Sequence, residues 1–347
     1  MIKPKNLLIV RTDRIGDVIL SLPLAGIVKK HFPECKVTFL LREYTKSLAL
    51  NNTNIDEIIV LDEHKGKIDI RKNISKISGY NFDSVLVVYP TFVTAMIIYL
   101  SGIKHRVGTG YRWYSVFFNH KIYKHRKYAE KHELEYNVEM LKEFGIQEEV
   151  SEENVIFDLK PDKEDKEKIK GIFTINYIQH NRLVIIIHPG SGGSAVDLPT
   201  EKFIELIRII DSKLDCVIII TGTESEKSLC SELVISNKVL NFAGKFRLPG
   251  LIALIDTADI FISNSTGPLH IAAALGKFCV GFYPRILSCS PKRWGPYTAK
   301  KIIFTPEINC VNCTRKQCEK LDCMKSIDPD KVYTSIEKIF NSQLRRV

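Results

Sequence analysis

Three turns rich in glycine and hydroxyl side chains follow apolar runs in the second half of the chain, at residues 188–194, 221–226 and 263–267. Each stands where a buried strand would end and a helix would begin. Backbone N–H groups in such turns, together with the positive end of a helix dipole, can bind phosphate. Each turn alone also fits an ordinary strand-to-helix connection, but three in one half predict a nucleotide pocket. None matches the phosphate-loop or GxGxxG pattern.

The turns offer different kinds of contact. Glycine-rich backbone supplies N–H groups, hydroxyl and imidazole side chains can hydrogen-bond, and a carboxylate after the second strand could hold ribose hydroxyls, as in dinucleotide folds. The candidate residues are Gly190, Ser191, Gly222, Glu226, Ser265, Thr266, Gly267 and His270.

In the first half, the pair Gly16 and Asp17 follows the apolar run at residues 6–11. A carboxylate at a strand-to-helix turn can accept a proton from a substrate hydroxyl. The alternative is that Asp17 caps the helix or stabilises its first turn without touching substrate. Both interpretations place Asp17 at the start of a helix.

The chain has 347 residues, enough for two domains, and a formal net charge of +10. This charge predicts an anionic partner, which could be nucleic acid, acidic lipid head groups or a phosphorylated substrate. The apolar run at residues 7–10 is too short for the core of a signal peptide, and no stretch approaches the ~20 apolar residues of a membrane span. We therefore expect a cytoplasmic protein that can contact a membrane surface.

Apolar runs alternate with segments of helical spacing, which predicts an α/β fold of doubly wound parallel sheets. A charged stretch at residues 160–170 is typical of a linker. The predicted division is therefore 1–165, 166–328 and a C-terminal helix in 329–347 that packs back towards the first domain. A ligand would lie between the halves, at the carboxyl ends of the strands. The predicted strands cover residues 6–11, 36–41, 55–61, 84–89, 105–108, 183–187, 216–220, 239–242, 259–262 and 278–282.

Residues 111–132 interleave aromatic side chains with histidine, lysine and arginine. Such a mixture suits a phosphorylated glycolipid, a membrane interface or nucleic acid. It also fits a solvated loop whose aromatic rings pack underneath. Nucleic-acid binding has no support beyond this segment and the net charge, so we expect none.

The chain holds nine cysteines, four of which cluster as Cys310, Cys313, Cys318 and Cys323. This spacing could bind zinc or an iron–sulfur cluster. Only the first pair has the two-residue spacing usual in such sites. Packed or redox-labile thiols in a surface loop are the alternative, and the sequence leaves the choice open.

Together these residues resemble glycosyltransferase family 9, the heptosyltransferases of bacterial lipopolysaccharide core assembly, over most of the chain. In the first half the resemblance rests on Ile9-Val10-Arg11-Thr12-Asp13-Arg14-Ile15-Gly16-Asp17-Val18 with Leu22-Pro23. In the second half it rests on His188-Pro189-Gly190-Ser191, Gly222 with Glu226, Ala243-Gly244-Lys245 and Ser265-Thr266-Gly267-Pro268-Leu269-His270. The tail from Cys310 to Met324, with Ile327 and Val332, is similar to that of the heptosyltransferase II type.

The resemblance implies a GT-B fold, with two Rossmann-like domains facing a central cleft, the first for the acceptor and the second for the sugar nucleotide. It implies inverting, metal-independent transfer of a heptose or related sugar from an ADP-sugar to a lipopolysaccharide core or other lipid-linked acceptor. No cofactor is implied, and the partners are the donor, a phosphorylated glycolipid and the inner face of the inner membrane. By residue, it implies that Asp17 is the general base, that Ser191, Glu226, Thr266, Gly267 and His270 contact the donor, and that Phe246 lies against the adenine.

The sequence departs from the family pattern around the donor phosphates. Val196 and Leu198 stand where the family usually carries a lysine and a tryptophan, and Ser265 replaces a frequent aspartate. Two alternatives therefore remain: a sugar-nucleotide epimerase or hydrolase of the same fold, and a sugar-nucleotide-binding protein without catalysis. Candidates to supply the missing cation are Lys292, Arg293 and Arg14.

Overall fold

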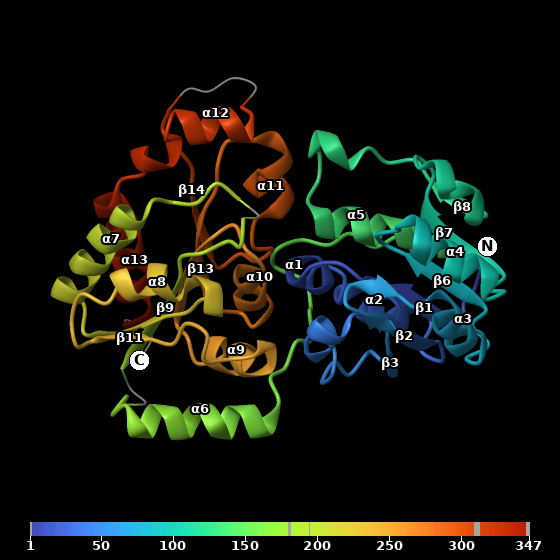
Figure 1. Cartoon of the computed structure of the whole chain (residues 1–347), viewed down its shortest axis with the longest axis horizontal. Helices are drawn as coiled ribbons and strands as arrows, with labels where there is room; N and C mark the ends of the chain where they lie inside the picture. Colours follow the sequence, from blue (N-terminus) through green and yellow to red (C-terminus); the bar gives the residue numbers. More distant parts are fainter. Residues whose placement is uncertain (1, 180–181, 194, 309–312, 345–347) are drawn as a thin grey trace. The chain divides into compact units, whose positions relative to one another are not determined.

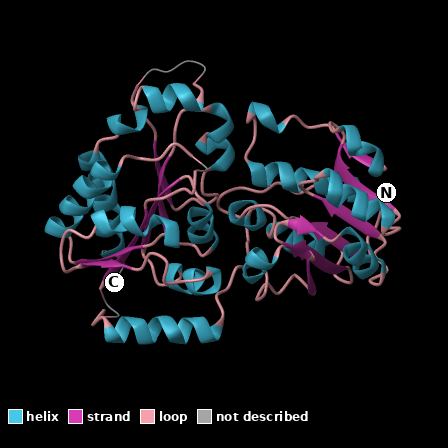
Figure 2. Ribbon diagram, in the orientation of Figure 1, coloured by secondary structure: helices cyan, strands magenta, loops and turns pink. Residues whose placement is uncertain are grey.

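The computed structural model describes residues 2–179, 182–193, 195–308 and 313–344. The chain forms two compact domains, Met1–Lys160 and Pro161–Val347. Each domain contains one six-stranded parallel sheet with helices packed around it (Figures 1 and 2). The predicted fold class of two Rossmann-like parallel-sheet domains is confirmed.

The first domain alternates strands with helices and short 3-10 turns. Its elements are β1 (Asn6–Val10), α1 (Ile15–Ile19), α2 (Pro23–His31), β2 (Lys36–Leu41), η1 (Glu43–Leu48), β3 (Glu57–Val60), β4 (Glu63–His64), β5 (Lys67–Ile68), α3 (Ile70–Ser78), β6 (Ser84–Val87), α4 (Phe92–Leu100), β7 (His105–Thr109), η2 (Trp113–Phe117), β8 (His120–Ile122), η3 (Arg126–Tyr128), α5 (Glu133–Glu139) and η4 (Met140–Phe144).

The second domain repeats the alternation after an initial helix. Its elements are α6 (Lys163–Ile175), β9 (Leu183–His188), α7 (Thr200–Lys213), β10 (Cys216–Ile220), η5 (Glu224–Glu226), α8 (Lys227–Glu232), β11 (Val239–Asn241), α9 (Leu248–Ile255), β12 (Ile260–Asn264), α10 (Gly267–Ala274), β13 (Phe278–Phe282), η6 (Leu287–Cys289), α11 (Pro291–Trp294), β14 (Lys301–Phe304), α12 (Arg315–Lys320), η7 (Cys323–Ser326) and α13 (Pro329–Leu344).

The two sheets share one strand order, β3-β2-β1-β6-β7-β8 in the first domain and β11-β10-β9-β12-β13-β14 in the second. In each domain the second and third of these strands along the chain lie on one side of the first, which is β1 or β9. The later strands lie on its other side. The order therefore reverses between β1 and β6, and again between β9 and β12. Ligands of open α/β sheets bind at this switch point, outside the carboxyl ends of the strands.

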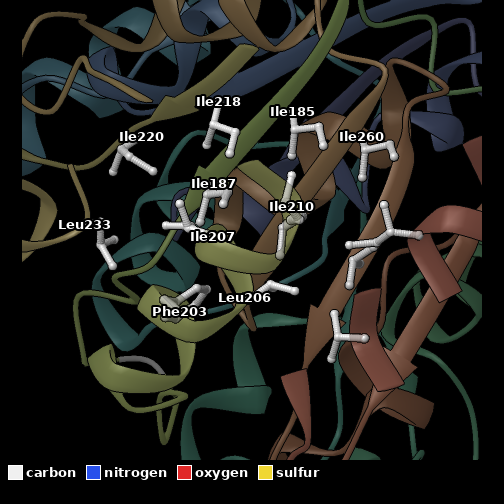
Figure 3. Close-up of a cluster of buried hydrophobic side chains, with 14 of the residues drawn as sticks. Ile185, Ile187, Phe203, Leu206, Ile207, Ile210, Ile218, Ile220, Leu233 and Ile260 are labelled. Carbon is white, nitrogen blue, oxygen red and sulfur yellow. The ribbon is translucent and has the colours of Figure 1, made fainter. Parts of the chain in front are cut away.

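The core of the second domain forms where α7 packs on the sheet. Strands β9 and β10 are uninterrupted apolar runs because both faces of a parallel sheet are covered. Helix α7 places its apolar side chains at helical spacing, so they form one face against the strands. Figure 3 shows both sets side by side, Phe203, Leu206, Ile207 and Ile210 from α7 and Ile185, Ile187, Ile218 and Ile220 from the sheet.

Helix α13 extends the same core. Val332, Tyr333 and Ile336 are buried in the α7 cluster, and α13 packs against α7. The predicted packing of the C-terminal helix towards the first domain stays a prediction, whereas these contacts place α13 in the core of the second domain. Its apolar face matches the apolar side of α7, and burying the two together removes both from water.

Short elements account for other differences from the predicted pattern. The segment after β1 forms two short helices, α1 and α2, with Pro23 at the start of the second. The edge strands β8 and β14 were not predicted, because runs of three and four residues carry little periodicity. Among the described residues, no helix combines the length and apolar character needed to cross a membrane.

Candidate functional site

A buried arginine binds two carboxylates after β1. The side chain of Arg11 is 1% exposed, and its Nε lies 2.8 Å from Oδ1 of Asp13. Its terminal nitrogen Nη2 donates a hydrogen bond to Oδ1 of Asp17. The strand places Arg11 at the switch point, and the turn into α1 brings both acidic residues back to it. The cluster therefore fixes the orientation of two carboxylates at the edge where substrates of such sheets bind.

Asp17 lies in the first turn of α1, where the helix dipole favours a negative charge. The backbone oxygen of Asp17 accepts a hydrogen bond of 2.9 Å from the Ser21 hydroxyl. Gly16 is buried beside it, whereas the Asp17 side chain is 16% exposed and within reach of a ligand. The two interpretations of Asp17 from the sequence are therefore compatible, since a first-turn carboxylate is also accessible.

The pKa of Asp13, a carboxylate of this cluster, departs clearly from its ordinary value. Burial raises the pKa of Asp13 to about 6, from 3.8, and the charge of Asp17 adds to this while Arg11 opposes it. The folded protein thus keeps a proton on Asp13 at pH values where the unfolded chain has lost it.

This shift predicts how stability changes with pH. As pH rises from about 4 to about 6, the unfolded chain releases the Asp13 proton first, so the contribution of Asp13 to the free energy of unfolding falls by about 3 kcal/mol. Asp13→Asn removes this dependence. Urea unfolding of wild type and variant at pH 4.5 and 7 measures it. Parallel changes in the two proteins would contradict the assignment.

In the second domain, Glu226 joins the turns after β9 and β10. Its Oε2 accepts hydrogen bonds of 2.8 Å from both the backbone N–H and the hydroxyl of Thr223. Its Oε1 accepts the Gly192 N–H at 3.3 Å. Burial opposes ionisation, yet the hydrogen bonds from Thr223 and from the Gly192 N–H leave the pKa of Glu226 lower than usual. Glu226 is thus an oriented carboxylate between two loops.

Gly190 and Gly222 allow this close approach. A Cβ on Gly190 would overlap the Glu226 carboxyl group, and a Cβ on Gly222 would lie 2.7 Å from Sγ of Cys230. Behind them, Nδ1 of His188 lies 3.0 Å from the Thr221 hydroxyl. Burial lowers the pKa of His188 to about 4, so its imidazole is neutral at pH 7.

Asn264, at the end of β12, joins the turn after that strand to the one after β9. Its Nδ2 donates to the Pro189 carbonyl oxygen at 2.5 Å, and its Oδ1 accepts the Leu198 N–H at 2.8 Å. At the switch point of this sheet, the buried side-chain amide of Asn264 therefore links the two turns. Ser265 and Thr266 follow directly.

Helix α10 starts at this switch point. Thr266 is its N-cap residue, and in the described structure the Thr266 side chain makes no capping hydrogen bond. Gly267 is the first helical residue, and His270 is buried on the first turn. The positive end of this helix and its first-turn N–H groups thus lie beside the Pro189–Gly190 turn, in the arrangement that binds anions.

Phe246 lies after β11, the neighbour of β10 in the sheet. Its ring packs edge-on against Phe242, with centroids 5.8 Å apart, and Cδ1 of Phe246 lies 3.1 Å from where a Gly250 Cβ would stand. All the predicted second-domain residues therefore follow β9, β10, β11 or β12 at one edge of one sheet. Asp17 belongs to the first domain.

Val196 lies in an apolar cavity of about 420 Å³, with Ala195, Ile286, Ser288, Cys289, Cys313, Thr314 and Arg315. Next to it, burial raises the pKa of Asp197, against hydrogen bonds from Ser191. The nearby cation is Arg315, whose two terminal nitrogens donate to the carbonyl oxygens of Gly193 and Ala195 at 2.8 and 2.9 Å. Sequence reasoning missed Arg315, because about 120 residues separate it from the loop.

The cysteine tail partly lies outside the described residues, since Cys310 is among those left out. Cys318 and Cys323 are buried with Ile286, and Cys289 and Cys313 pack against them. Within residues 2–179, 182–193, 195–308 and 313–344, no group of three or more histidine, cysteine or acidic side chains is arranged to hold a metal ion. The described cysteines of the tail therefore pack against one another. Whether a metal binds with the help of Cys310 stays untested.

Comparison with known proteins places this geometry in a family. The family model for glycosyltransferase family 9 (heptosyltransferase) matches residues 70–324. A Haemophilus influenzae protein named provisionally as a glycosyltransferase is 29% identical over 87% of this chain and 89% of its own length.

Two solved structures of Escherichia coli proteins share the fold. ADP-heptose lipopolysaccharide heptosyltransferase II superposes with a TM-score of 0.80 at 18% identity, covering 97% of this chain and 99% of that one. Heptosyltransferase WaaC with ADP-2-deoxy-2-fluoro heptose gives 0.70 at 17% identity, over 96% and 99% of the two chains. Since the family model spans more than half of the sequence, this chain belongs to glycosyltransferase family 9 and is a glycosyltransferase.

Proposed function

We propose that the protein transfers a heptose from ADP-heptose to a lipopolysaccharide core or related lipid-linked acceptor, by an inverting reaction without a metal. The observation that carries this proposal is the joining of three turns at the β9/β12 switch point by Glu226 and Asn264. These turns can hold a nucleoside diphosphate. The proposed sugar is a heptose because the names of the two similar Escherichia coli structures include ADP-heptose or its fluorinated analogue.

The proposed reaction is a single displacement. The acceptor hydroxyl oxygen attacks the anomeric carbon on the face opposite the diphosphate, the bond from that carbon to the diphosphate oxygen breaks, and ADP leaves. Asp17 takes the hydroxyl proton as general base. First-turn N–H groups of α10, beginning at Gly267, and the Ser191 turn stabilise the charge that grows on the leaving oxygen.

The donor contacts follow from the geometry of the second sheet. Glu226 accepts hydrogen bonds and can hold ribose hydroxyls, and Phe246 after β11 offers a ring for the adenine. Val196 places no charge near the phosphates. Arg315 donates hydrogen bonds to the carbonyl oxygens of Gly193 and Ala195. It thereby brings a cation to the loop after β9 and orients the backbone N–H groups of that loop.

The acceptor is proposed to be a phosphorylated glycolipid at the inner face of the inner membrane, met by the cytoplasmic protein at the membrane surface. The basic surface of a chain with net charge +10 favours such an anionic substrate.

The decisive experiment incubates the purified protein with ADP-heptose and truncated lipopolysaccharide acceptors. ADP release should require the acceptor, the acceptor should gain one heptose by mass spectrometry, and EDTA should leave the rate unchanged. NMR of the product should show an inverted anomeric centre. ADP release without acceptor would favour a hydrolase instead, and donor binding without any turnover would favour a binding protein.

Gly190→Ala provides a test of the donor pocket. The added Cβ would displace the Glu226 carboxyl group from its hydrogen bonds, so we expect the dissociation constant for ADP to rise about tenfold. Isothermal titration calorimetry measures it. Gly171→Ala is the matched control, because nothing lies within 4 Å of a Cβ there and ADP binding should be unchanged. If Gly190→Ala and Gly171→Ala bound ADP with equal affinity, Glu226 would not be part of the donor site.

A further inference from the structure

The outer face of α4 is apolar and exposed. Residues 90–103 contain no charged side chain. A surface helix normally turns polar side chains towards water, yet α4 exposes Phe92, Tyr99 and Leu100 by 37%, 47% and 53%. The adjoining turn η2 adds Trp113 and Val116, which are 77% and 70% exposed. These five residues are called the α4 patch below.

The α4 patch is a connected surface. The rings of Phe92 and Trp113 stack with centroids 4.8 Å apart. Phe117 joins the two ends, 6.0 Å from Phe92 and 5.3 Å from Tyr99. Figure 1 labels α4 in the first domain, and η2 packs on both α4 and β7. Connected apolar surfaces rimmed by polar residues mark contact with another molecule.

The chain around the patch is rich in cations. Between residues 104 and 131 the chain carries eight lysines and arginines but one acidic residue, Glu130. Lys104 stands four residues after the end of α4, and Arg112 precedes Trp113. Lys121 lies on the edge strand β8, and Lys124 lies just after it. All four are exposed. The partner of this surface is therefore both apolar and anionic.

We propose that the α4 patch docks on a lipid bilayer that contains anionic phospholipids. Trp113 and Tyr99 would lie at the level of the head groups, Leu100 and Val116 would enter the acyl boundary, and the adjoining cations would bind lipid phosphates. This inference rests on the proposed function and deepens it, because it names the surface through which the first domain reaches a lipid-linked acceptor.

Charge and shape favour a bilayer over other partners. A second copy of the chain would bring its own cations against these, since each copy carries a net charge of +10. A nucleic acid would pair with the cations and stack on aromatic rings, but it would leave the aliphatic side chains of Leu100 and Val116 without an apolar partner. A bilayer satisfies both parts of the surface.

Vesicle sedimentation of the full-length protein tests the proposal. We expect about tenfold tighter binding to phosphatidylcholine vesicles containing about 30% phosphatidylglycerol than to pure phosphatidylcholine. The double variant L100S/W113S should lose about tenfold in affinity for the anionic vesicles. The control I175S/Y177S removes side chains that are 76% and 92% exposed in the second domain, and it should bind as wild type does.

Tryptophan fluorescence locates the contact. The chain has two tryptophans, so Trp294→Phe leaves Trp113 as the sole reporter. Its emission should shift to shorter wavelength on adding anionic vesicles, and brominated lipids should quench it. On a water-soluble core oligosaccharide, L100S/W113S should transfer heptose as fast as wild type. On acceptor embedded in vesicles, it should be about tenfold slower.

Several results would overturn the docking surface. The first is wild-type affinity for vesicles that does not depend on lipid charge, and the second is a Trp113 emission that does not shift when vesicles are added. The third is a loss of vesicle affinity in I175S/Y177S equal to that in L100S/W113S. The fourth is a dimer or an RNA complex that L100S/W113S abolishes while its vesicle binding persists. These binding results do not depend on turnover. Vesicle docking by a protein that transfers no heptose would therefore contradict the proposed function and leave the docking surface standing.

Discussion

Asp17→Asn is expected to lower kcat for heptose transfer by about 10²–10⁴-fold, because the amide cannot accept the acceptor hydroxyl proton. The amide keeps the size of the side chain and its place beside Arg11, so the fold should persist. The affinity for ADP should change by less than about threefold, since the donor turns belong to the second domain. Steady-state rates of ADP release and calorimetric titration with ADP measure the two quantities.

Asp13→Asn is the matched control for the base. It removes the other carboxylate bound to the same guanidinium, 2.8 Å from Nε of Arg11, without removing Asp17. Its loss in kcat should be much smaller, with a changed pH profile. If Asp13→Asn lost more activity than Asp17→Asn, the base would be Asp13. If Asp17→Asn stayed within a few-fold of wild type, Asp17 would not be the base.

Arg11→Met is expected to be the most destabilising of these changes. The guanidinium is 1% exposed and pairs with both Asp13 and Asp17. Removing one side of a buried ion pair leaves uncompensated charge and costs about 3–5 kcal/mol of unfolding free energy. Urea unfolding in a Trp294→Phe background measures it, because Trp113 then reports on the first domain alone.

A second arginine provides the comparison. Arg182 pairs with Asp215, but the two side chains are 27% and 88% exposed, so Arg182→Met should cost less than about 1 kcal/mol. Arg182 lies in the second domain, so the unfolding of this variant is measured in a Trp113→Phe background, where Trp294 reports on that domain. Arg11→Met combined with Asp13→Asn should recover part of the lost stability, because one of the stranded charges is gone. Equal costs for Arg11→Met and Arg182→Met would show that the Arg11 cluster is no more stabilising than a surface pair.

Much of the fold could be predicted because parallel strands are buried on both faces. β9 and β10 therefore appear in the sequence as apolar runs, and helix α7 between them appears as an amphipathic segment. The turn residues that follow them could be predicted for the same reason. Helix α13 could not be placed, because an apolar face shows that a helix packs and does not show on what.

The candidate site was only partly accessible from sequence. Gly190, Glu226 and Thr266 stand in the turns after predicted strands, where glycine, carboxylate and hydroxyl side chains are informative. The cluster around Arg11 was missed as a unit, although a cation at the end of an apolar strand was a signal. Arg315 carried no local signal, since its contacts with Gly193 and Ala195 depend on how the tail returns to the sheet.

The sequence by itself determined which turns carry groups able to bind phosphate or move a proton, because side-chain chemistry and strand periodicity are local. Only the tertiary structure decided which of those turns meet. β6 lies beside β1 and β12 beside β9, and neither pairing has a local signal, because strands far apart in the chain pair through backbone groups that every residue shares. That order places Arg11 at one switch point and Asn264 at the other.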